Sequence, residues 1–274
     1  MQQVGPIFVN DLFEPMLERL LQLLRSLSKQ EWRRATPCAG WTVKDLTLHL
    51  LGDEIGQLSR GRDKDFSSLL PPGADLVERI NRNNELWVEA TRRMSPRLIC
   101  DLLDMAGHEV VDYFKSLDLM AMNGTVSWAG PDPAPVWLDV AREYTERWHH
   151  QQHIREAVGQ PGLMEAEFLA PVLDTFVRAL PYTFRAVSAP AGTAIQFTVV
   201  GDAGHSWSLV RDEERWALFR GTPVAPAATI TMDEQTAWKL FTKGIAKDKA
   251  KKHARVQGDE TLAATLFDAV AIIA

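Results

Sequence analysis

The sequence has few cysteines, no long apolar run and no excess of positive charge. Its two cysteines, Cys38 and Cys100, are too few for the disulfide framework of a small secreted domain. No apolar run approaches the roughly 20 residues of a transmembrane helix, and the first residues lack the positive flank and apolar core of a signal peptide. The net charge of -6 gives no basic surface of the kind that nucleic-acid-binding domains carry. We therefore expect a cytoplasmic protein that binds neither nucleic acid nor a membrane.

The hydrophobic pattern changes near residues 188–192. With 274 residues, of which 46% are hydrophobic, the chain is long enough for two domains of about 100–200 residues each. Apolar side chains recur at helical spacing before Ser188, whereas short β-branched and aromatic segments follow Gly192. We predict an α+β protein with a helical bundle over residues 1–188 and a small α/β domain over residues 189–274.

The same hydrophobic periodicities predict the individual helices and strands. Helices are predicted over residues 10–28, 43–61, 75–94, 97–118, 134–158 and 165–185. Strands are predicted, in the order of a meander, over residues 194–200, 206–210, 215–219 and 228–232, with two further helices over residues 233–243 and 260–273. Thr42 or a neighbouring residue is placed to cap the helix that begins at Val43.

A cluster of polar side chains occupies one of the predicted helices. Glu146, His149, His150 and His153 stand at positions i, i+3, i+4 and i+7, and at about 100° per residue they share one face of a helix. Imidazole and carboxylate ligands suit zinc and also nickel, iron(II) or manganese, and the absence of a cysteine pair argues against a closed thiolate site. The alternative is a solvated polar face, or histidines that are partly buried and purely structural. One helix supplies two metal ligands comfortably, so a metal site needs at least one more from another segment.

His49 is the candidate for that further ligand. It lies on the helix that begins at Val43, beside the apolar stripe that Leu46 and Leu50 continue. A histidine on an apolar face is more often structural than functional. The assignment of His49 as a ligand therefore depends on its surroundings.

Those surroundings resemble a known protein family. The resemblance is carried by residues Gly40 to Leu50 (Gly-Trp-Thr-Val-Lys-Asp-Leu-Thr-Leu-His-Leu), by the Leu-Gly-Asp-Glu that follows, and by residues Glu146 to Arg155 (Glu-Arg-Trp-His-His-Gln-Gln-His-Ile-Arg). These segments resemble the mycothiol-dependent maleylpyruvate isomerase family, within the wider group of DinB/YfiT-like metalloenzymes. The likeness extends over nearly the whole chain.

The resemblance implies a fold and a set of metal ligands. It implies a DinB-like four-helix bundle that holds a divalent metal ion, zinc first, through His49, Glu146 and His150. Many members of the family have an aspartate at the position of His153, so His153 is either a further ligand or a group that supports the ligands.

The C-terminal part resembles the sterol-carrier-like domain that the same family carries. The isomerase uses an arginine late in that domain, and Arg255, shortly before Gly258, is the nearest candidate here. As a catalytic residue, Arg255 would hold a substrate carboxylate through a bidentate pair.

The same resemblance suggests the chemistry. Three protein ligands leave a metal ion with an open coordination position, which in this family accepts the thiolate of a low-molecular-weight thiol. We expect mycothiol or an analogue as co-substrate and a small electrophile as the second substrate, in a transfer or an isomerisation. Neither Cys38 nor Cys100 is expected to act as a nucleophile, because packing explains both.

Two alternatives stay open at this point. In the first, the protein is a metal-dependent hydrolase that needs no thiol, with Asp53 or Glu54 as the general base. In the second, it is a non-catalytic protein in which a metal with four protein ligands stabilises the bundle and the C-terminal domain binds a small ligand.

Overall fold

The computed structural model describes residues 1–67 and 75–273, which form two compact units. A helical unit comprises Val9–Asp118 and Glu143–Leu163, and a sheet unit comprises Met1–Phe8, Leu119–Arg142 and Met164–Ile273. The α+β prediction is confirmed. The predicted domain boundary between residues 188 and 189 stays a prediction, because the compact units are made of discontinuous segments and divide the chain at other places.

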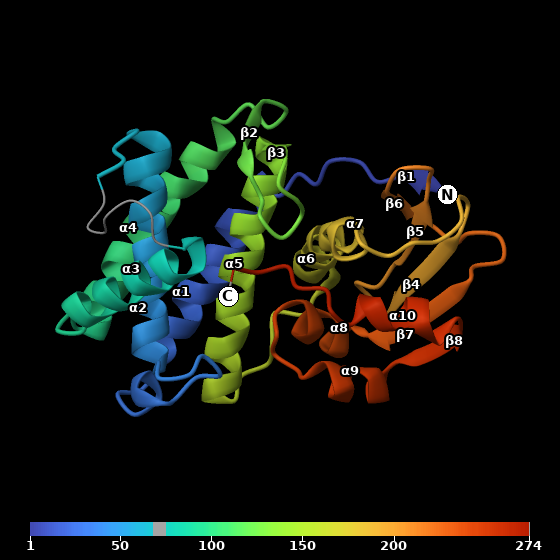
Figure 1. The fold of residues 1–274 in the computed structure, drawn as a ribbon. Coiled ribbons are helices and arrows are strands. Elements are labelled where there is room, and N and C mark those ends of the chain that lie inside the picture. The colour runs from blue at the N-terminus through green and yellow to red at the C-terminus, as the bar shows by residue number, and fades with distance from the viewer. Residues whose placement is uncertain (68–74, 274) are drawn as a thin grey trace. The chain divides into compact units, whose positions relative to one another are not determined.

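Helices make up most of the described part of the helical unit (Figure 1). They are α1 (Phe13–Ser26), α2 (Val43–Gly56), α3 (Leu76–Thr91), α4 (Pro96–Lys115) and the C-terminal part of α5 (Val136–Val158). Short turns of helix are η1 (Asn10–Leu12), η2 (Glu31–Arg33) and the π-helical η3 (Gln57–Arg62). Helix α4 packs on α1 and α2, and α3 packs on α2.

Helix α2 begins at Val43 because Thr42 caps it. The Thr42 side chain accepts a hydrogen bond from the Asp45 backbone N–H, and the Asp45 carboxylate accepts one from the Thr42 N–H. This capping box satisfies two of the amide donors that an uncapped helix start leaves free. The predicted cap is thus confirmed, and it fixes the register of the helix that carries His49.

The apolar face of α5 is buried in the core of the helical unit. Ile154 and Val158 belong to the same buried cluster as side chains of α1, α2 and α4, including Leu24, Leu46 and Leu103. Burial of apolar side chains is the main stabilising contribution to such a unit. The polar residues of α5 are therefore held at fixed positions opposite α2.

The sheet unit contains a six-stranded sheet with strand order β1-β6-β5-β4-β7-β8. The strands are β1 (Gln2–Gln3), β4 (Ala194–Val200), β5 (Ser206–Arg211), β6 (Trp216–Arg220), β7 (Ala228–Asp233) and β8 (Arg255–Gly258). β4, β5 and β6 form the predicted meander, but β7 pairs with β4 in parallel and does not continue it. A separate two-stranded sheet joins β2 (Met122–Thr125) and β3 (Pro133–Pro135).

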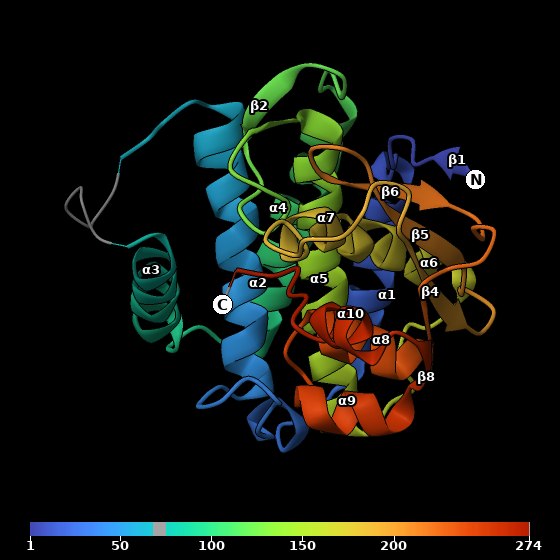
Figure 2. The ribbon, with the colours of Figure 1, turned by 45° about the vertical axis from the view of Figure 1, so that its right-hand side comes forward.

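Helices cover one face of the larger sheet, as Figure 2 shows. They include α7 (Leu180–Thr183), α8 (Glu234–Phe241) and α10 (Glu260–Leu266), which pack on strands, while α6 (Ala166–Phe176) and α9 (Lys247–His253) pack on α8. Along β4, Ile195, Phe197 and Val199 are buried, whereas Gln196 and Thr198 between them are partly exposed. This alternation is typical of a sheet with one covered face. No helix within residues 1–67 and 75–273 combines the length and the apolar character needed to cross a membrane.

Candidate metal centre

Helices α2 and α5 bring three potential ligand atoms together. His49 Nε2 of α2 lies 3.2 Å from His150 Nε2 of α5 and 3.5 Å from Glu146 Oε1. Glu146 Oε1 lies 2.8 Å from His150 Nε2, as expected for positions i and i+4. A tetrahedral ion with bonds of about 2.0–2.1 Å separates its ligand atoms by about 3.3 Å. The three atoms are thus spaced as the ligands of one divalent cation would be.

The three side chains form a charged group in which both histidines are buried and the Glu146 side chain is 29% exposed. Of the two histidines, His49 is 5% and His150 9% exposed. Burial disfavours the charged imidazole of His150, but Glu146 and Cys38 outweigh this effect and raise its pKa to about 10. Burial also disfavours the Glu146 carboxylate, yet His150 and His49 lower its pKa well below the usual value. The carboxylate is therefore ionised and stabilised by neighbouring positive charge, which a bound cation would also supply.

Asp53 contributes a second carboxylate beside this group. It stands one turn after His49, and its Oδ2 lies 3.3 Å from His49 Nε2. This oxygen is buried and accepts no hydrogen bond from the residues that the structure describes. Burial raises the pKa of Asp53; His49 opposes this rise, and Glu146 adds to it. A buried acceptor without a donor, next to two imidazoles and a carboxylate, fits a centre that binds a cation.

His153 lies beside Cys38 in a second group. Its Nδ1 is 3.1 Å from Cys38 Sγ, and His150 Nδ1 is 3.9 Å from the same sulfur. The opposite nitrogen atoms of the His150 ring therefore face different partners, with Nε2 toward His49 and Glu146 and Nδ1 toward Cys38. The structure thus brings together all four predicted ligands, but His153 is associated with Cys38.

The position of Cys38 is the feature that the sequence did not show. Packing in a turn was expected, whereas the thiol in fact points to two imidazoles of α5. Burial alone would raise the pKa of Cys38, but hydrogen bonds to His150 and His153 lower it to about 6. The loop is fixed by the Thr36 hydroxyl, which donates to the Trp41 carbonyl, and by the Trp41 N–H, which donates to the Cys38 carbonyl. No spacing rule links Cys38 to His150 and His153, because 112 and 115 positions separate them along the chain.

His149 packs against the other two histidines of this part of α5. Its ring stacks on His150 with centroids 5.3 Å apart and meets the edge of His153 at 4.2 Å. Burial lowers the pKa of His149 well below the usual value, and the positive charges of His150 and His153 lower it further. Among the described residues, His149 belongs to neither of the two ligand groups.

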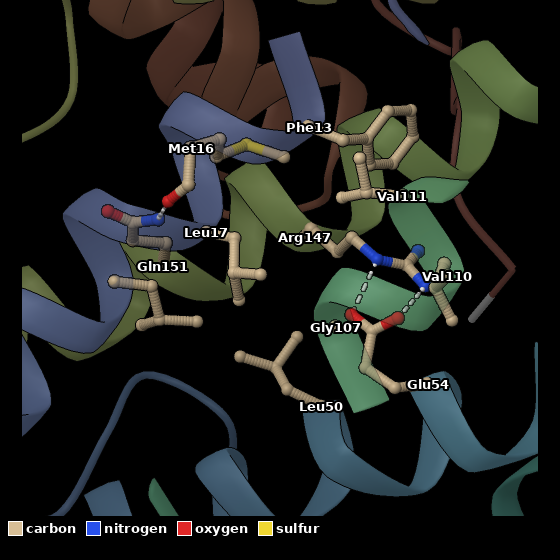
Figure 3. A pocket seen from close by; sticks show the side chains of 11 residues that line it. Phe13, Met16, Leu17, Leu50, Glu54, Gly107, Val110, Val111, Arg147 and Gln151 are labelled. Atoms are coloured by element: carbon tan, nitrogen blue, oxygen red, sulfur yellow. Dashed lines mark hydrogen bonds and ion pairs between the residues drawn. The ribbon is translucent and has the colours of Figure 1, made fainter. Parts of the chain in front are cut away.

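Arg147 links α5 to α2 one residue away from Glu146 (Figure 3). Its guanidinium donates from Nε and Nη2 to the two oxygens of Glu54, at 2.8 and 2.9 Å, and from Nη1 to Glu143 at 2.7 Å. Burial disfavours the guanidinium charge, but Glu54 and Glu143 raise the pKa of Arg147 above its usual value. Glu54, one of the two bases considered for a hydrolase, is therefore occupied by an ion pair. A cavity of about 20 Å³, enough for roughly one water molecule, lies beside this pair and is lined mainly by apolar side chains.

Arg255 belongs to the sheet unit. It is the first residue of β8, where its register partner is Thr231 of β7, and its side chain is exposed. A catalytic role for Arg255 stays a prediction.

Comparisons with known proteins are consistent with the fold described above. A family model described as the mycothiol maleylpyruvate isomerase N-terminal domain matches residues 13–155. The crystal structure of a mycothiol-dependent maleylpyruvate isomerase is similar with a TM-score of 0.50 and 11% sequence identity, over 84% of this chain and 86% of that chain. A mutant of a mycothiol-dependent maleylpyruvate isomerase, with one histidine changed to alanine, gives the same TM-score and coverage at 10% identity.

A smaller structure matches part of the chain. Sterol carrier protein 2 like 2 from Aedes aegypti is 18% identical and covers 36% of this chain and 95% of its own, with a TM-score of 0.29. Among curated proteins, none matches the sequence. At 10% and 11% identity, the two isomerase structures show a shared fold alone.

Proposed function

The chain belongs to the mycothiol maleylpyruvate isomerase N-terminal domain family, and on that premise we propose that it is a metal- and thiol-dependent enzyme. The co-substrate would be a low-molecular-weight thiol, mycothiol or an analogue. The second substrate would be a small electrophile, which is either isomerised through a thiol adduct or released as the adduct.

The observation that carries the proposal is the triangle of His49 Nε2, Glu146 Oε1 and His150 Nε2, with sides of 3.2, 2.8 and 3.5 Å. These residues would hold a divalent cation, with zinc favoured by the ligand types. A bound divalent cation supplies positive charge that favours the thiolate form of a thiol over its neutral form. Three protein ligands leave room for such a thiol, as catalytic metal sites require.

Other residues of the chain would orient the thiol and support the ligands. Asp53 Oδ2 is a buried acceptor 3.3 Å from His49 Nε2, so it can accept a hydrogen bond from a group that enters beside His49. Trp41 packs against the His49 ring, with centroids 5.1 Å apart, and restricts its orientation. The ion pair of Arg147 with Glu54 holds α5 against α2 at the same level. Arg255 is proposed to bind a carboxylate of the electrophile.

The first test is whether His49 and His150 hold metal. Metal-free protein would be dialysed against limiting zinc, and bound zinc would be measured in the wild type, His49→Ala and His150→Ala. The matched control is His108→Ala, since His108 is a partly exposed histidine of α4 that contacts Glu18 and Asp104. We expect both site variants to lose the tightest zinc equivalent and the control to keep it. Retention of that equivalent by both site variants would contradict the proposed site.

The second test addresses the thiol. Calorimetric titration with mycothiol, or with a simpler thiol, should show binding to the zinc-loaded wild type and none to the zinc-loaded buffer or to His49→Ala. Turnover of an electrophile such as maleylpyruvate should then require the thiol. Hydrolysis without any thiol would instead favour the metal-dependent hydrolase, and a metal ion that admits no thiol would favour the binding protein.

A further inference from the structure

Two ligand groups meet at one imidazole. The first consists of His49, Glu146 and His150 through Nε2; the second consists of Cys38, His153 and His150 through Nδ1. In each group the potential ligand atoms lie within 4.8 Å of one another. We propose that Cys38, His153 and His150 form a second metal position, and that the His150 ring bridges it to the first.

The distances of the second group fit a metal ion that is bound by one sulfur and two nitrogen atoms. Cys38 Sγ lies 3.1 Å from His153 Nδ1 and 3.9 Å from His150 Nδ1. Bonds of about 2.3 Å to sulfur and 2.0–2.1 Å to nitrogen, in tetrahedral geometry, place sulfur about 3.6 Å from each nitrogen. The two observed distances lie on either side of that value, so small movements of the side chains would suffice.

The surroundings keep these groups in place. His150 and His153 are buried, and Cys38 is half-buried in a loop fixed at both ends by hydrogen bonds. His150 and His153 come from consecutive turns of α5, whereas Cys38 comes from the loop before α2. A metal ion would therefore join the two segments that also meet at the first site.

The ligand chemistry distinguishes the two positions. The first group offers two imidazoles and a carboxylate, which many divalent ions accept, whereas a thiolate favours softer ions such as zinc. Binding at the second position displaces the proton on Nδ1 of His150, together with any proton that the Cys38 sulfur still holds, and these protons go to solvent. His150 then binds as an imidazolate, whose negative charge is stabilised by a cation on each side.

The second metal position depends on the first proposed metal site, and so on the proposed function, only because both positions use His150. Its three ligands include none of His49, Asp53 or Glu146. Separate variants can therefore test the two positions independently. His150 is the one residue whose loss should affect both.

Cobalt(II) can test the proposal in the full-length protein, because a thiolate ligand adds a charge-transfer absorption that nitrogen and oxygen ligands lack. When metal-free wild-type protein is titrated with cobalt(II), it should bind two equivalents and show this absorption. Cys38→Ser and His153→Ala should each bind one equivalent of cobalt and lack the charge-transfer absorption. His49→Ala should also bind one equivalent, but it should show the absorption. His150→Ala should lose both, whereas Cys100→Ser, which alters the only other cysteine, should resemble the wild type.

The outcomes separate the two proposals. Saturation of the wild type at one equivalent, or a Cys38→Ser variant that still binds two, would overturn the second position. Two equivalents retained by His49→Ala would instead contradict the first site. If Cys38→Ser fails to fold, wild-type protein is alkylated with iodoacetamide at zero, one and two equivalents of zinc. Protection of Cys38 that develops with the second equivalent supports the proposal, and its absence refutes it.

Discussion

Replacement of Arg147 by methionine should destabilise the helical unit strongly, because the buried guanidinium of Arg147 pairs with two buried carboxylates. The Arg147 side chain is 8% exposed, and those of Glu54 and Glu143 are 5% and 8% exposed. Methionine keeps most of the apolar stem but leaves Glu54 and Glu143 without the guanidinium. Removal of one partner from a buried ion pair costs about 3–5 kcal/mol. Lost contacts of the guanidinium with the Phe13 and Phe114 rings, at 5.7 and 5.6 Å, add about 1 kcal/mol.

Glu54→Gln should cost less, about 1–3 kcal/mol, because Arg147 keeps Glu143 and glutamine still accepts one hydrogen bond. Arg62→Met is a matched surface control. Arg62 also contacts two carboxylates, Asp63 and Glu109, but its side chain is 41% exposed, so the cost should stay below about 1 kcal/mol. Urea unfolding followed by circular dichroism would give the midpoints, and hydrogen exchange of α2 and of residues 143–158 of α5 would report on the helical unit alone.

The cost of Arg147→Met should also depend on pH. Burial raises the pKa of Glu54 even in the wild type, and Arg147 is the group that opposes this rise. Without Arg147 the folded-state pKa increases further above the unfolded value of about 4.3. A raised carboxyl pKa means that stability is lost as pH rises through the interval between these two values. Arg147→Met should therefore be least damaging near pH 4 and most damaging near pH 8, and a cost that is independent of pH or no greater than that of Glu54→Gln would refute the reasoning.

Three further changes test the structure around the site and in the sheet. Gly52→Ala should destabilise α2 against α3 by about 1–3 kcal/mol in urea unfolding, since the added Cβ would lie 2.7 Å from Trp87 Cδ1; unchanged stability would show that the tryptophan moves freely. Asp45→Ala should cost about 1–2 kcal/mol at pH 7 through the lost cap and the lost pair with Arg92. Burial opposes the Asp45 charge, but Arg92 and the cap lower its pKa, so the advantage of the wild type should vanish as pH falls below about 4. Gly258→Ala should lower the melting temperature, at a cost above about 2 kcal/mol, because its φ is +87° and a Cβ would lie 2.2 Å from a backbone carbonyl oxygen; a wild-type melting temperature would contradict this geometry.

The sequence by itself determined most of the longer helices and strands and one half of the site. Helical periodicity places Glu146 and His150 on the same face of a helix wherever that helix packs, because side chains at i and i+4 always point the same way. The Thr42 cap was equally local, since a capping box involves residues only three positions apart. The change from helical to strand periods near residue 190 predicted the α+β class. His49 was a candidate from its place on the preceding helix, and its assignment as a ligand depended on the resemblance of its segment to a family.

The tertiary structure decided what long-range packing brings together. A strand of two residues carries no periodic signal, so the pairing of β1 with β6 could not be predicted, and nothing local distinguishes a parallel β7 from a continued meander. Glu54 was considered as a base, but the guanidinium of α5 occupies it. Cys38 looked like a turn residue until α5 placed two imidazoles beside it. Such contacts join residues about 90 to 115 positions apart, and they depend on how whole helices pack, which the spacing of residues within one helix does not encode.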